Sequence, residues 1–381
     1  MTQCPTEVFI DCIPSFLRPR NTDWRYGRYS IPRLPEFTTG IKCHVQSSRS
    51  VTIRANGIHI YNAIAQRTGL GGTILPYVDT TESFLSQREL ADSQAHVVYS
   101  HRGFPCNAGS IPVIWHYAQL DPLMLTAKGI PERDIIAERD RLAEIFARAA
   151  YVQVPTATEA ERHKRDFPKS ADRFVAIPFL LPDLEPIQEA DVIAKHRQFD
   201  LIRIIFVGSE ARRKGLDVLY DQLESLAPSI RKRIHLTVVS AFQDGEVARP
   251  INLEQQVFRG LPHADTMRLM QRSHILAVPS RFESHGLVFV EAMATGAIPI
   301  APSWEPQRDI VDNGKAGLCC RPDTMDLAQY IDQLVSSQPY REELAIAGLK
   351  RFKTTFAREV VAGKYKKLFE AARVLGERRG G

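Results

Sequence analysis

The sequence predicts an α/β fold made of two doubly wound domains that face a central cleft. From residue 201 onward, short runs rich in Val, Ile and Leu alternate with amphipathic stretches, a pattern typical of a parallel sheet wrapped by helices. The first half of the chain repeats this pattern less regularly. A length of 381 residues also exceeds what one hydrophobic core usually organises, so two domains are expected.

The C-terminal half contains the clearer series of elements. The expected helix at residues 214–230 places Leu216, Leu219, Tyr220 and Leu223 at helical spacing, as in a helix that packs on a sheet. The expected strands are residues 201–208, 234–240, 274–280 and 297–303, and the other expected helices are residues 264–273, 287–296 and the stretch from residue 340 to the end.

The N-terminal half contains a second series. Residues 14–50 combine Arg, Pro and aromatic residues without a clear period, so we expect long loops there that line the cleft. The expected strands are residues 96–100, 111–117, 151–155 and 173–178, and the expected helices are residues 57–69 and 138–150.

The domain boundaries follow from these two series. The Pro-rich stretch Ile177–Gln188 has the composition of an interdomain connection. We therefore predict an N-terminal domain at residues 1–183, a C-terminal domain at residues 184–356, and a helix at residues 357–381 that packs back on the N-terminal domain.

Composition excludes several classes of protein. The first twenty residues lack the pattern of a secretion signal, and no run of about 18 apolar residues appears. The six cysteines lack the spacing of a zinc site or a disulfide framework, so we expect a cytoplasmic protein. A net charge of +5 is too small and too evenly spread to indicate nucleic acid as a partner.

Two strand-to-helix junctions contain residues suited to binding an anion. In open α/β sheets, ligands bind where strands end and helices begin. The first junction follows Gly208 and presents Arg213 and Lys214 just before a helix, where they would attract a diphosphate. A solvated basic turn is the ordinary interpretation of such a stretch, and we give the two interpretations similar weight.

The second junction is the stretch RFESHGLVFVEAMATG, which begins at Arg281. Its helix would aim free N–H groups of Gly286, Leu287 and Val288 at an anion. Taken singly, Glu283 is an ordinary first-turn carboxylate and Glu291 an exposed helix residue. Because the helix around Glu291 is almost wholly apolar, its carboxylate needs a polar partner, and a ligand hydroxyl would serve.

Glu283 and Glu291, with seven intervening residues, resemble the paired-glutamate motif of the retaining glycosyltransferases of family 4, the group 1 glycosyltransferases with the GT-B fold. The resemblance continues in order over residues 203–334, through FVGSEARRKGLDVL, VFRGLPHADTMRLMQRSHILAVPS, ATGAIPIAPS and DIVDNGKAGLCCRPDTMDLAQYI. In the first half it is carried mainly by VIWHYAQLDP and AERDRLAEIFARAAYVQVPTATEAE.

The resemblance implies a role for each candidate residue. Arg213 and Lys214 would neutralise the diphosphate of a nucleotide-sugar donor. Glu283 would meet hydroxyls of the donor sugar, and Glu291 the ribose hydroxyls. The N-terminal domain would face the acceptor, with His116 close to the reacting sugar; without the resemblance, His116 would be interpreted as a core histidine. The remaining donor-binding residues implied are Gly208, Leu261, Pro262, Ser284, His285, Gly286, Leu287 and Val288.

The sequence also departs from the family. Many relatives have an arginine where this chain has Ser209, and Arg212 or Arg213 would compensate. The glycine pair that often opens the first helix is absent after Ile13. No Asp-x-Asp strand end is found for Mg²⁺ or Mn²⁺, so no metal site and no cofactor besides the donor are expected. Retention of configuration is implied by the resemblance alone.

The leading hypothesis is a retaining glycosyltransferase that moves a hexose from a nucleotide sugar to a glycan or lipid-linked acceptor, in surface polysaccharide or lipopolysaccharide biosynthesis. Two alternatives remain open: a GT-B enzyme with a soluble acceptor, and a noncatalytic nucleotide-sugar-binding subunit. The basic cluster Glu161–Lys169 is ordinarily a solvated helix face. The alternative is peripheral contact with an anionic membrane at its inner face.

Overall fold

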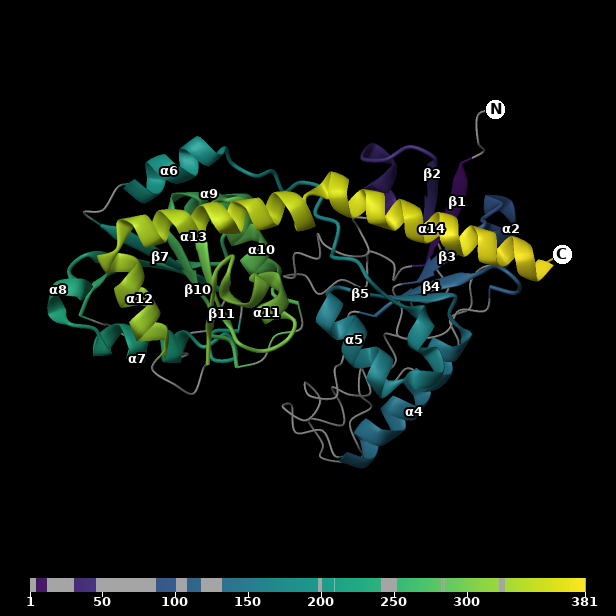
Figure 1. Cartoon of the computed structure of the whole chain (residues 1–381), viewed down its shortest axis with the longest axis horizontal. Coiled ribbons are helices and arrows are strands. Elements are labelled where there is room, and N and C mark those ends of the chain that lie inside the picture. Colours follow the sequence, from purple (N-terminus) through teal and green to yellow (C-terminus); the bar gives the residue numbers. More distant parts are fainter. Residues whose placement is uncertain are drawn as a thin grey trace. The chain divides into compact units, whose positions relative to one another are not determined.

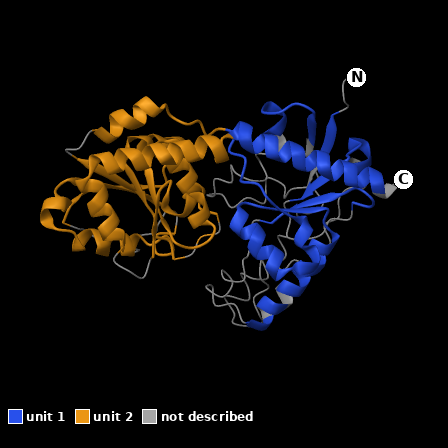
Figure 2. Cartoon of the chain, viewed as in Figure 1, with its two compact units in different colours: residues 1–182, 358–381 blue, residues 183–357 orange. Residues whose placement is uncertain are grey.

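The computed structural model of the chain contains two compact units (Figure 2). Unit 1 comprises Met1–Pro182 and Arg358–Gly381, and unit 2 comprises Asp183–Ala357. The chain passes from unit 1 to unit 2 inside the Pro-rich stretch Ile177–Gln188. The structure describes residues 5–11, 31–45, 87–100, 108–117, 132–197, 201–208, 210–240, 252–281, 283, 285–321 and 326–380.

Unit 2 is built on a six-stranded sheet in which every described pairing is parallel. The strand order is β12-β11-β10-β7-β8-β9, so the chain moves outward from β7 in one direction and then in the other. The strands are β7 (Ile202–Val207), β8 (Ile234–Ser240), β9 (Glu254–Arg259), β10 (Ile275–Ala277), β11 (Ile298–Pro302) and β12 (Leu318–Cys320). The reversal of strand order between β7 and β10 is the topological switch point, where open α/β sheets bind ligands.

Helices flank the sheet of unit 2 (Figure 1). They are α6 (Glu189–Arg197), α7 (Leu216–Ser225), α8 (Pro228–Arg231), α9 (His263–Arg272), α10 (Leu287–Ala294), α11 (Gln307–Ile310), α12 (Asp326–Ser336) and α13 (Gln338–Arg351), with a 3₁₀ turn at Asp312–Gly314 and a π turn at Phe352–Phe356. Leu216, Leu219, Tyr220 and Leu223 are all buried, as their spacing on α7 predicts.

Unit 1 is built on a second parallel six-stranded sheet, with the order β2-β1-β3-β4-β5-β6. Its strands are β1 (Thr6–Asp11), β2 (Ile41–Val45), β3 (Val97–Ser100), β4 (Val113–His116), β5 (Tyr151–Val154) and β6 (Phe174–Ala176). Its helices are α2 (Gln87–Ser93), α4 (Glu132–Arg148), α5 (Ala157–Asp166) and α14 (Arg358–Gly380), with 3₁₀ turns at Ile31–Glu36 and Pro168–Arg173.

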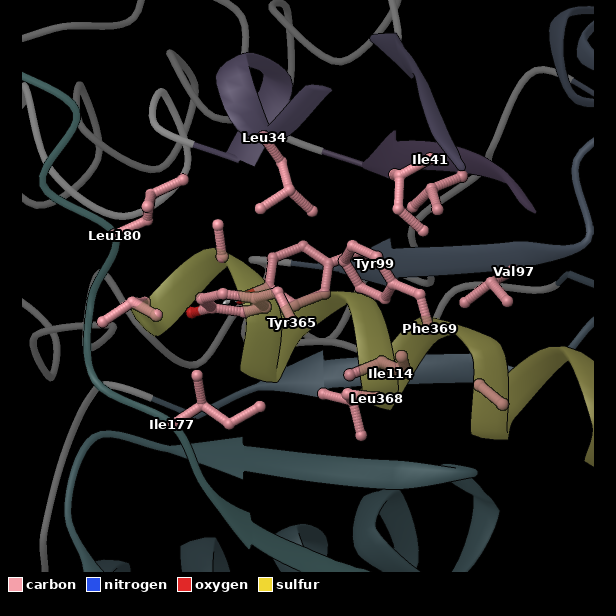
Figure 3. Close-up of a cluster of buried hydrophobic side chains, with 14 residues drawn as sticks. Leu34, Ile41, Val97, Tyr99, Ile114, Ile177, Leu180, Tyr365, Leu368 and Phe369 are labelled. Carbon is pink, nitrogen blue, oxygen red and sulfur yellow. Dashed lines mark hydrogen bonds between the residues drawn. The ribbon is translucent and has the colours of Figure 1, made fainter. Parts of the chain in front are cut away.

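Helix α14, at the C-terminal end of the chain, packs on the sheet of unit 1. It lies against β1 and β3 and contributes Tyr365, Leu368 and Phe369 to the buried core, as Figure 3 shows. The ring of Phe369 packs edge-on against Tyr99, with centroids 5.6 Å apart. The last helix of the chain is therefore part of the core formed by its first strands.

The predicted fold class is confirmed, and one local prediction is wrong. Residues 14–50 were expected to be loops, but Ile41–Val45 forms β2 and pairs in register with β1. The alternation of apolar Ile41, Cys43 and Val45 with Lys42 and His44 is a strand pattern that the prediction overlooked because it spans only five residues. Pairing with the distant strand β1 fixes it. The helix expected at residues 57–69 lies outside the described residues.

A buried basic cluster joins four helix ends of unit 2. Lys195, at the end of α6, donates from its Nζ to the carbonyls of Gln271 on α9, at 3.2 Å, and of Thr295 after α10, at 2.9 Å. Arg341 is fully buried and donates to the carbonyls of Leu334 on α12, at 2.6 Å, and of His196 on α6, at 2.9 Å. These side chains satisfy carbonyls that have no partner within their own helices. The charge of Arg341 also opposes the negative ends of the helix dipoles, whereas burial lowers the pKa of Lys195 to about 7.

We predict that Arg341→Met destabilises the protein, because it leaves two helix-end carbonyls buried without their charged donor. Each such hydrogen bond contributes roughly 1.5–3 kcal/mol, and the relief from desolvating the guanidinium offsets part of the loss, so about 2–4 kcal/mol is expected. Urea unfolding measures this free energy. Arg268→Met is the matched control, because Arg268 is exposed and its ion pair within the described residues is with Asp265, one turn earlier. Equal unfolding midpoints for the two variants would contradict the capping role.

Candidate functional site

The candidate site lies at the C-terminal edge of the unit 2 sheet. β7, β10 and β11 are neighbours that run in the same direction, so the loops that follow them begin at the same edge. Both junctions singled out from the sequence follow two of these strands. The topological switch point therefore brings the two predicted motifs together.

Two glycines shape the loop after β7. Gly215 precedes α7 in the left-handed conformation with φ of 79°, and a Cβ atom there would lie 2.2 Å from the carbonyl oxygen of Pro279, in the loop after β10. A Cβ atom on Gly208 would lie 2.6 Å from Cγ of Lys214. Glycine at both positions allows the two loops to touch and the side chain of Lys214 to cross the end of β7.

Glu283 forms ion pairs with Lys214 and Arg213 of that loop. Its side chain is 8% exposed and accepts a hydrogen bond from Nζ of Lys214, with Nη1 of Arg213 at 3.8 Å. Burial alone would raise the pKa of Glu283, but Lys214, together with Arg213 and His285, holds it below the usual value. The carboxylate is therefore ionised at neutral pH. Residues predicted from two separate motifs form one charged cluster.

Arg281 braces this cluster and was not predicted from the sequence. Its guanidinium makes a bidentate pair with Asp217 on α7, at 2.8 and 2.7 Å, and also donates to the carbonyl of Arg212. The backbone N–H of Arg281 donates to the carbonyl of Arg213 at 2.9 Å. Arg281 therefore ties the loop after β10 to the basic loop after β7. No sequence signal could have identified a pair that is 64 residues apart.

The N-terminus of α10 follows Glu283 directly. Gly286 begins the helix with φ of 69°, and a Cβ atom there would lie 2.7 Å from the ring of Phe289. The N–H groups of Leu287 and Val288 are in the first turn, where a helix has no internal acceptor for them. Burial lowers the pKa of His285 to about 4 despite the nearby Glu283, so its imidazole is neutral. Ser284 lies outside the described residues.

Glu291 is buried and has a partner within the protein. His263 Nε2 donates to Oε1 of Glu291 at 2.8 Å. The sequence argument correctly required a polar partner for Glu291, but it offered only a ligand hydroxyl. Leu261 and Pro262 immediately precede His263, so the structure brings this predicted segment next to Glu291. The position of His263 in the first turn of α9 was a signal that could have been used.

Gln307, the first residue of α11, supports the loop that holds Glu283. It is fully buried, and its Nε2 donates to the carbonyl of Glu283 at 3.4 Å. Its Oε1 has no hydrogen-bond partner in the described part of the chain. The stretch WEPQRD contains no pattern from which this contact could have been predicted.

His116 lies at the end of β4 in unit 1 and is buried in a polar network. Its Nδ1 contacts Oε1 of Gln153 and lies 3.1 Å from the hydroxyl of Tyr99. That hydroxyl is 3.0 Å from Gln153 Oε1 and 3.4 Å from the hydroxyl of Tyr365 on α14. The predicted residue is thus held by side chains from β3, β5 and α14. It belongs to unit 1, whereas the Glu283 cluster belongs to unit 2.

Two further properties of the described residues bear on the predictions. Among them, no group of three or more His, Cys, Asp or Glu side chains is placed to hold a metal ion. None of the helices in the same residues combines the length and apolarity that crossing a bilayer requires.

Comparison with known proteins finds a family match within unit 2. The profile described as glycosyl transferases group 1 matches residues 191–351. A D-inositol 3-phosphate glycosyltransferase from Geodermatophilus obscurus is 28% identical over 253 residues, which cover 61% of this chain and 53% of the relative. The chain therefore matches about half the length of that curated relative.

Solved structures support the fold over nearly the whole chain. Anabaena HepE in complex with UDP has a TM-score of 0.62 at 13% identity, with 96% of this chain and 100% of that chain covered. WaaG, a glycosyltransferase involved in lipopolysaccharide biosynthesis, has a TM-score of 0.60 at 14% identity, with 95% and 99% covered. At such identities the similarity shows the fold alone, which is the GT-B fold.

We predict that Lys214 and Glu283 stabilise the protein as a coupled pair. Lys214→Met removes the nearest cation of a buried carboxylate, so a loss of roughly 2–4 kcal/mol is expected at pH 7. In the double variant with Glu283→Gln, the loss should be well below the sum of the two single losses, because both remove one interaction. Urea unfolding of the four proteins completes the cycle; additive losses would show that the pair is not coupled.

The same cycle carries a pH signature. Because the pKa of folded Glu283 lies below the ordinary value of 4.5, its ionisation adds stability that is present above that pH. This contribution is lost as the pH falls through the folded-state pKa. Glu283→Gln should remove this part of the acid sensitivity.

Proposed function

We propose that the protein is a retaining, metal-independent glycosyltransferase, because residues 191–351 match the profile of the group 1 glycosyl transferases and the chain has the GT-B fold. It moves a hexose from a nucleotide-sugar donor to a glycan or lipid-linked acceptor in surface polysaccharide or lipopolysaccharide biosynthesis. The observation that carries the proposal is the cluster of Lys214, Arg213 and Glu283 beside the N-terminus of α10.

The charges of the cluster suit transfer from a glycosyl diphosphate. Breaking the bond between sugar and phosphate builds negative charge on the leaving diphosphate and positive charge on the sugar ring. Lys214, Arg213 and the first N–H groups of α10 stabilise the leaving group without a metal ion. Glu283 accepts hydrogen bonds from donor-sugar hydroxyls, and its ionised state, supported by the lowered pKa, suits that role.

The nucleoside part of the donor binds next to α9 and α10. Glu291 accepts hydrogen bonds from the ribose hydroxyls, and His263 holds its carboxylate in place. The backbone at Leu261 and Pro262 contacts the base, and Gly208 permits close approach of the donor. His116 lies near the reacting sugar in the same scheme. UDP-glucose is the first donor to test, because Anabaena HepE was solved in complex with it.

Donor binding tests this proposal. We expect one class among UDP-, GDP-, ADP- and CMP-sugars to raise the melting temperature, because a ligand that binds only the folded protein stabilises it. Glu291→Ala should weaken that shift, because it removes the acceptor for the ribose. Glu283→Gln should keep most of the shift but abolish sugar transfer, measured as release of nucleoside diphosphate with an acceptor mixture.

The variants also separate the alternatives. Absence of any shift would contradict the proposed donor site. A normal shift together with unchanged turnover in Glu283→Gln would remove Glu283 from the mechanism. Binding without transfer to lipid-linked and soluble acceptors alike would favour the noncatalytic subunit.

We also propose that the acceptor is associated with a membrane. Basic residues at the end of α5 and in the 3₁₀ turn that follows it support this proposal. Arg165 and Lys169 are exposed there, while Lys164 pairs with Glu161 at 2.7 Å. Each basic residue near an anionic bilayer contributes about 1 kcal/mol to binding.

We therefore predict that the protein co-sediments with anionic liposomes more than with neutral ones. Replacing Arg165 and Lys169 with Gln should weaken the anionic binding by at least about tenfold. Equal sedimentation with the two lipids would contradict membrane binding, and the basic face of α5 would then be an ordinary solvated surface.

A further inference from the structure

Trp304 is the one aromatic among the large hydrophobic side chains that are exposed in the described residues. It is 46% exposed, whereas the others, Ile136, Val257 and Val374, are aliphatic. Tryptophan offers a large flat apolar surface with one N–H donor, so it contributes most when a ligand covers it. Single exposed hydrophobic residues are common on protein surfaces, so exposure alone does not indicate a binding role for Trp304. Its position in the fold is the further evidence.

The position of Trp304 is at the edge of the sheet that carries the Glu283 cluster. Trp304 lies between β11 and α11, and β11 pairs in parallel with β10, which leads to Glu283. Arg308 N–H donates to the carbonyl of Trp304 at 2.9 Å, which closes one turn around Gln307. Gln307 in turn donates to the carbonyl of Glu283 at 3.4 Å. The segment 304–308 that carries Trp304 is therefore tied to the loop of Glu283 through Gln307, three residues after Trp304.

The backbone that carries Trp304 is fixed on both sides. The N–H of Ser303 donates to the carbonyl of Cys320 at 2.8 Å, which continues the pairing of β11 with β12. The carbonyl of Trp304 is held by α11 as described above. Hydrogen bonds therefore hold the backbone on both sides of Trp304, and a backbone that is already ordered loses less entropy when a ligand binds.

Two partly exposed polar side chains lie within four residues of Trp304 in the sequence. Glu305 and Arg308 have 29% and 49% of their side chains exposed, and Nη2 of Arg308 lies 3.9 Å from Oε1 of Glu305. They offer an acceptor and several donors beside an apolar surface. This combination fits a ring that is apolar on its face and carries hydroxyls at its rim.

We propose that Trp304 is a platform on which a pyranose ring stacks. A pyranose presents C–H groups on its face, so stacking buries apolar surface on both partners while the hydroxyls remain free to bond with Glu305 and Arg308. Because Gln307 of the same segment contacts the loop of Glu283, we assign this ring to the sugar of the donor rather than to a sugar of the acceptor. The inference rests on the proposed function, because it names a residue that recognises the transferred group.

The experiment compares UDP with UDP-glucose, and the GDP and ADP pairs in parallel, by isothermal titration calorimetry. For the pair that the wild-type protein binds, Trp304→Ala should weaken the nucleotide sugar about tenfold and leave the nucleoside diphosphate within about twofold. Trp304→Phe should retain most of the affinity, since it keeps an aromatic face. A purely structural role would weaken both ligands together.

Val257→Ala is the matched control, because it truncates another exposed apolar side chain of unit 2. Val257 lies on β9, the outermost strand on the side of the sheet away from β11. It should change neither affinity. Unchanged binding of the nucleotide sugar in Trp304→Ala, or equal losses for both ligands, overturns the inference while leaving the proposed function intact. A raised KM for the acceptor with unchanged donor affinity would overturn the assignment to the donor sugar. Failure of the wild-type protein to bind any pair contradicts the proposed function itself, and the inference with it.

Discussion

The parallel direction of every described strand pairing in unit 2 is the constraint on which the rest of that unit depends. Each helix that connects parallel strands must begin at one edge of the sheet and end at the other. Helix N-termini, with their free N–H groups, gather where the strands end, and helix C-termini gather at the opposite edge. Lys195 and Arg341 lie at that opposite edge and donate to helix-end carbonyls. The edge where the strands end has the positive ends of the helices instead, and a negatively charged ligand would be favourable there.

At the binding edge, the same polarity explains why a carboxylate lies among cations. Without a ligand, Lys214 and Arg213 would be concentrated beside the positive end of α10, and like charges would repel each other. Glu283 offsets this charge and keeps Lys214 directed across the end of β7. Such a buried pair contributes modest net stability, because desolvation opposes attraction. In the proposed function its value is in orientation, since the diphosphate of a donor would meet cations that are already ordered.

The sequence was sufficient where the information is local. Runs of β-branched residues, the spacing of Leu216 and Leu219 on α7, and the two glutamates at their fixed separation all describe neighbours along the chain. Contacts between distant segments were not predictable. Strand β2 depends on β1, Arg281 meets Asp217 across 64 residues, and Gln307 reaches Glu283 from a loop without a pattern. In each case the partner is determined by the order of the strands in the sheet, and the local propensity of the residues does not encode that order.

The network around His116 shows how the fold can also determine the tautomer of a histidine. Nε2 of Gln153 donates to the carbonyl of Ile177, which fixes the amide so that Oε1 faces the histidine. That oxygen only accepts, so the proton of a neutral His116 belongs on Nδ1, and Nε2 is the accepting nitrogen. Burial raises the pKa of Tyr99 and Tyr365, so both hydroxyls keep their protons and remain donors. Because Tyr365 comes from α14, the last helix of the chain helps to hold a side chain at the end of β4.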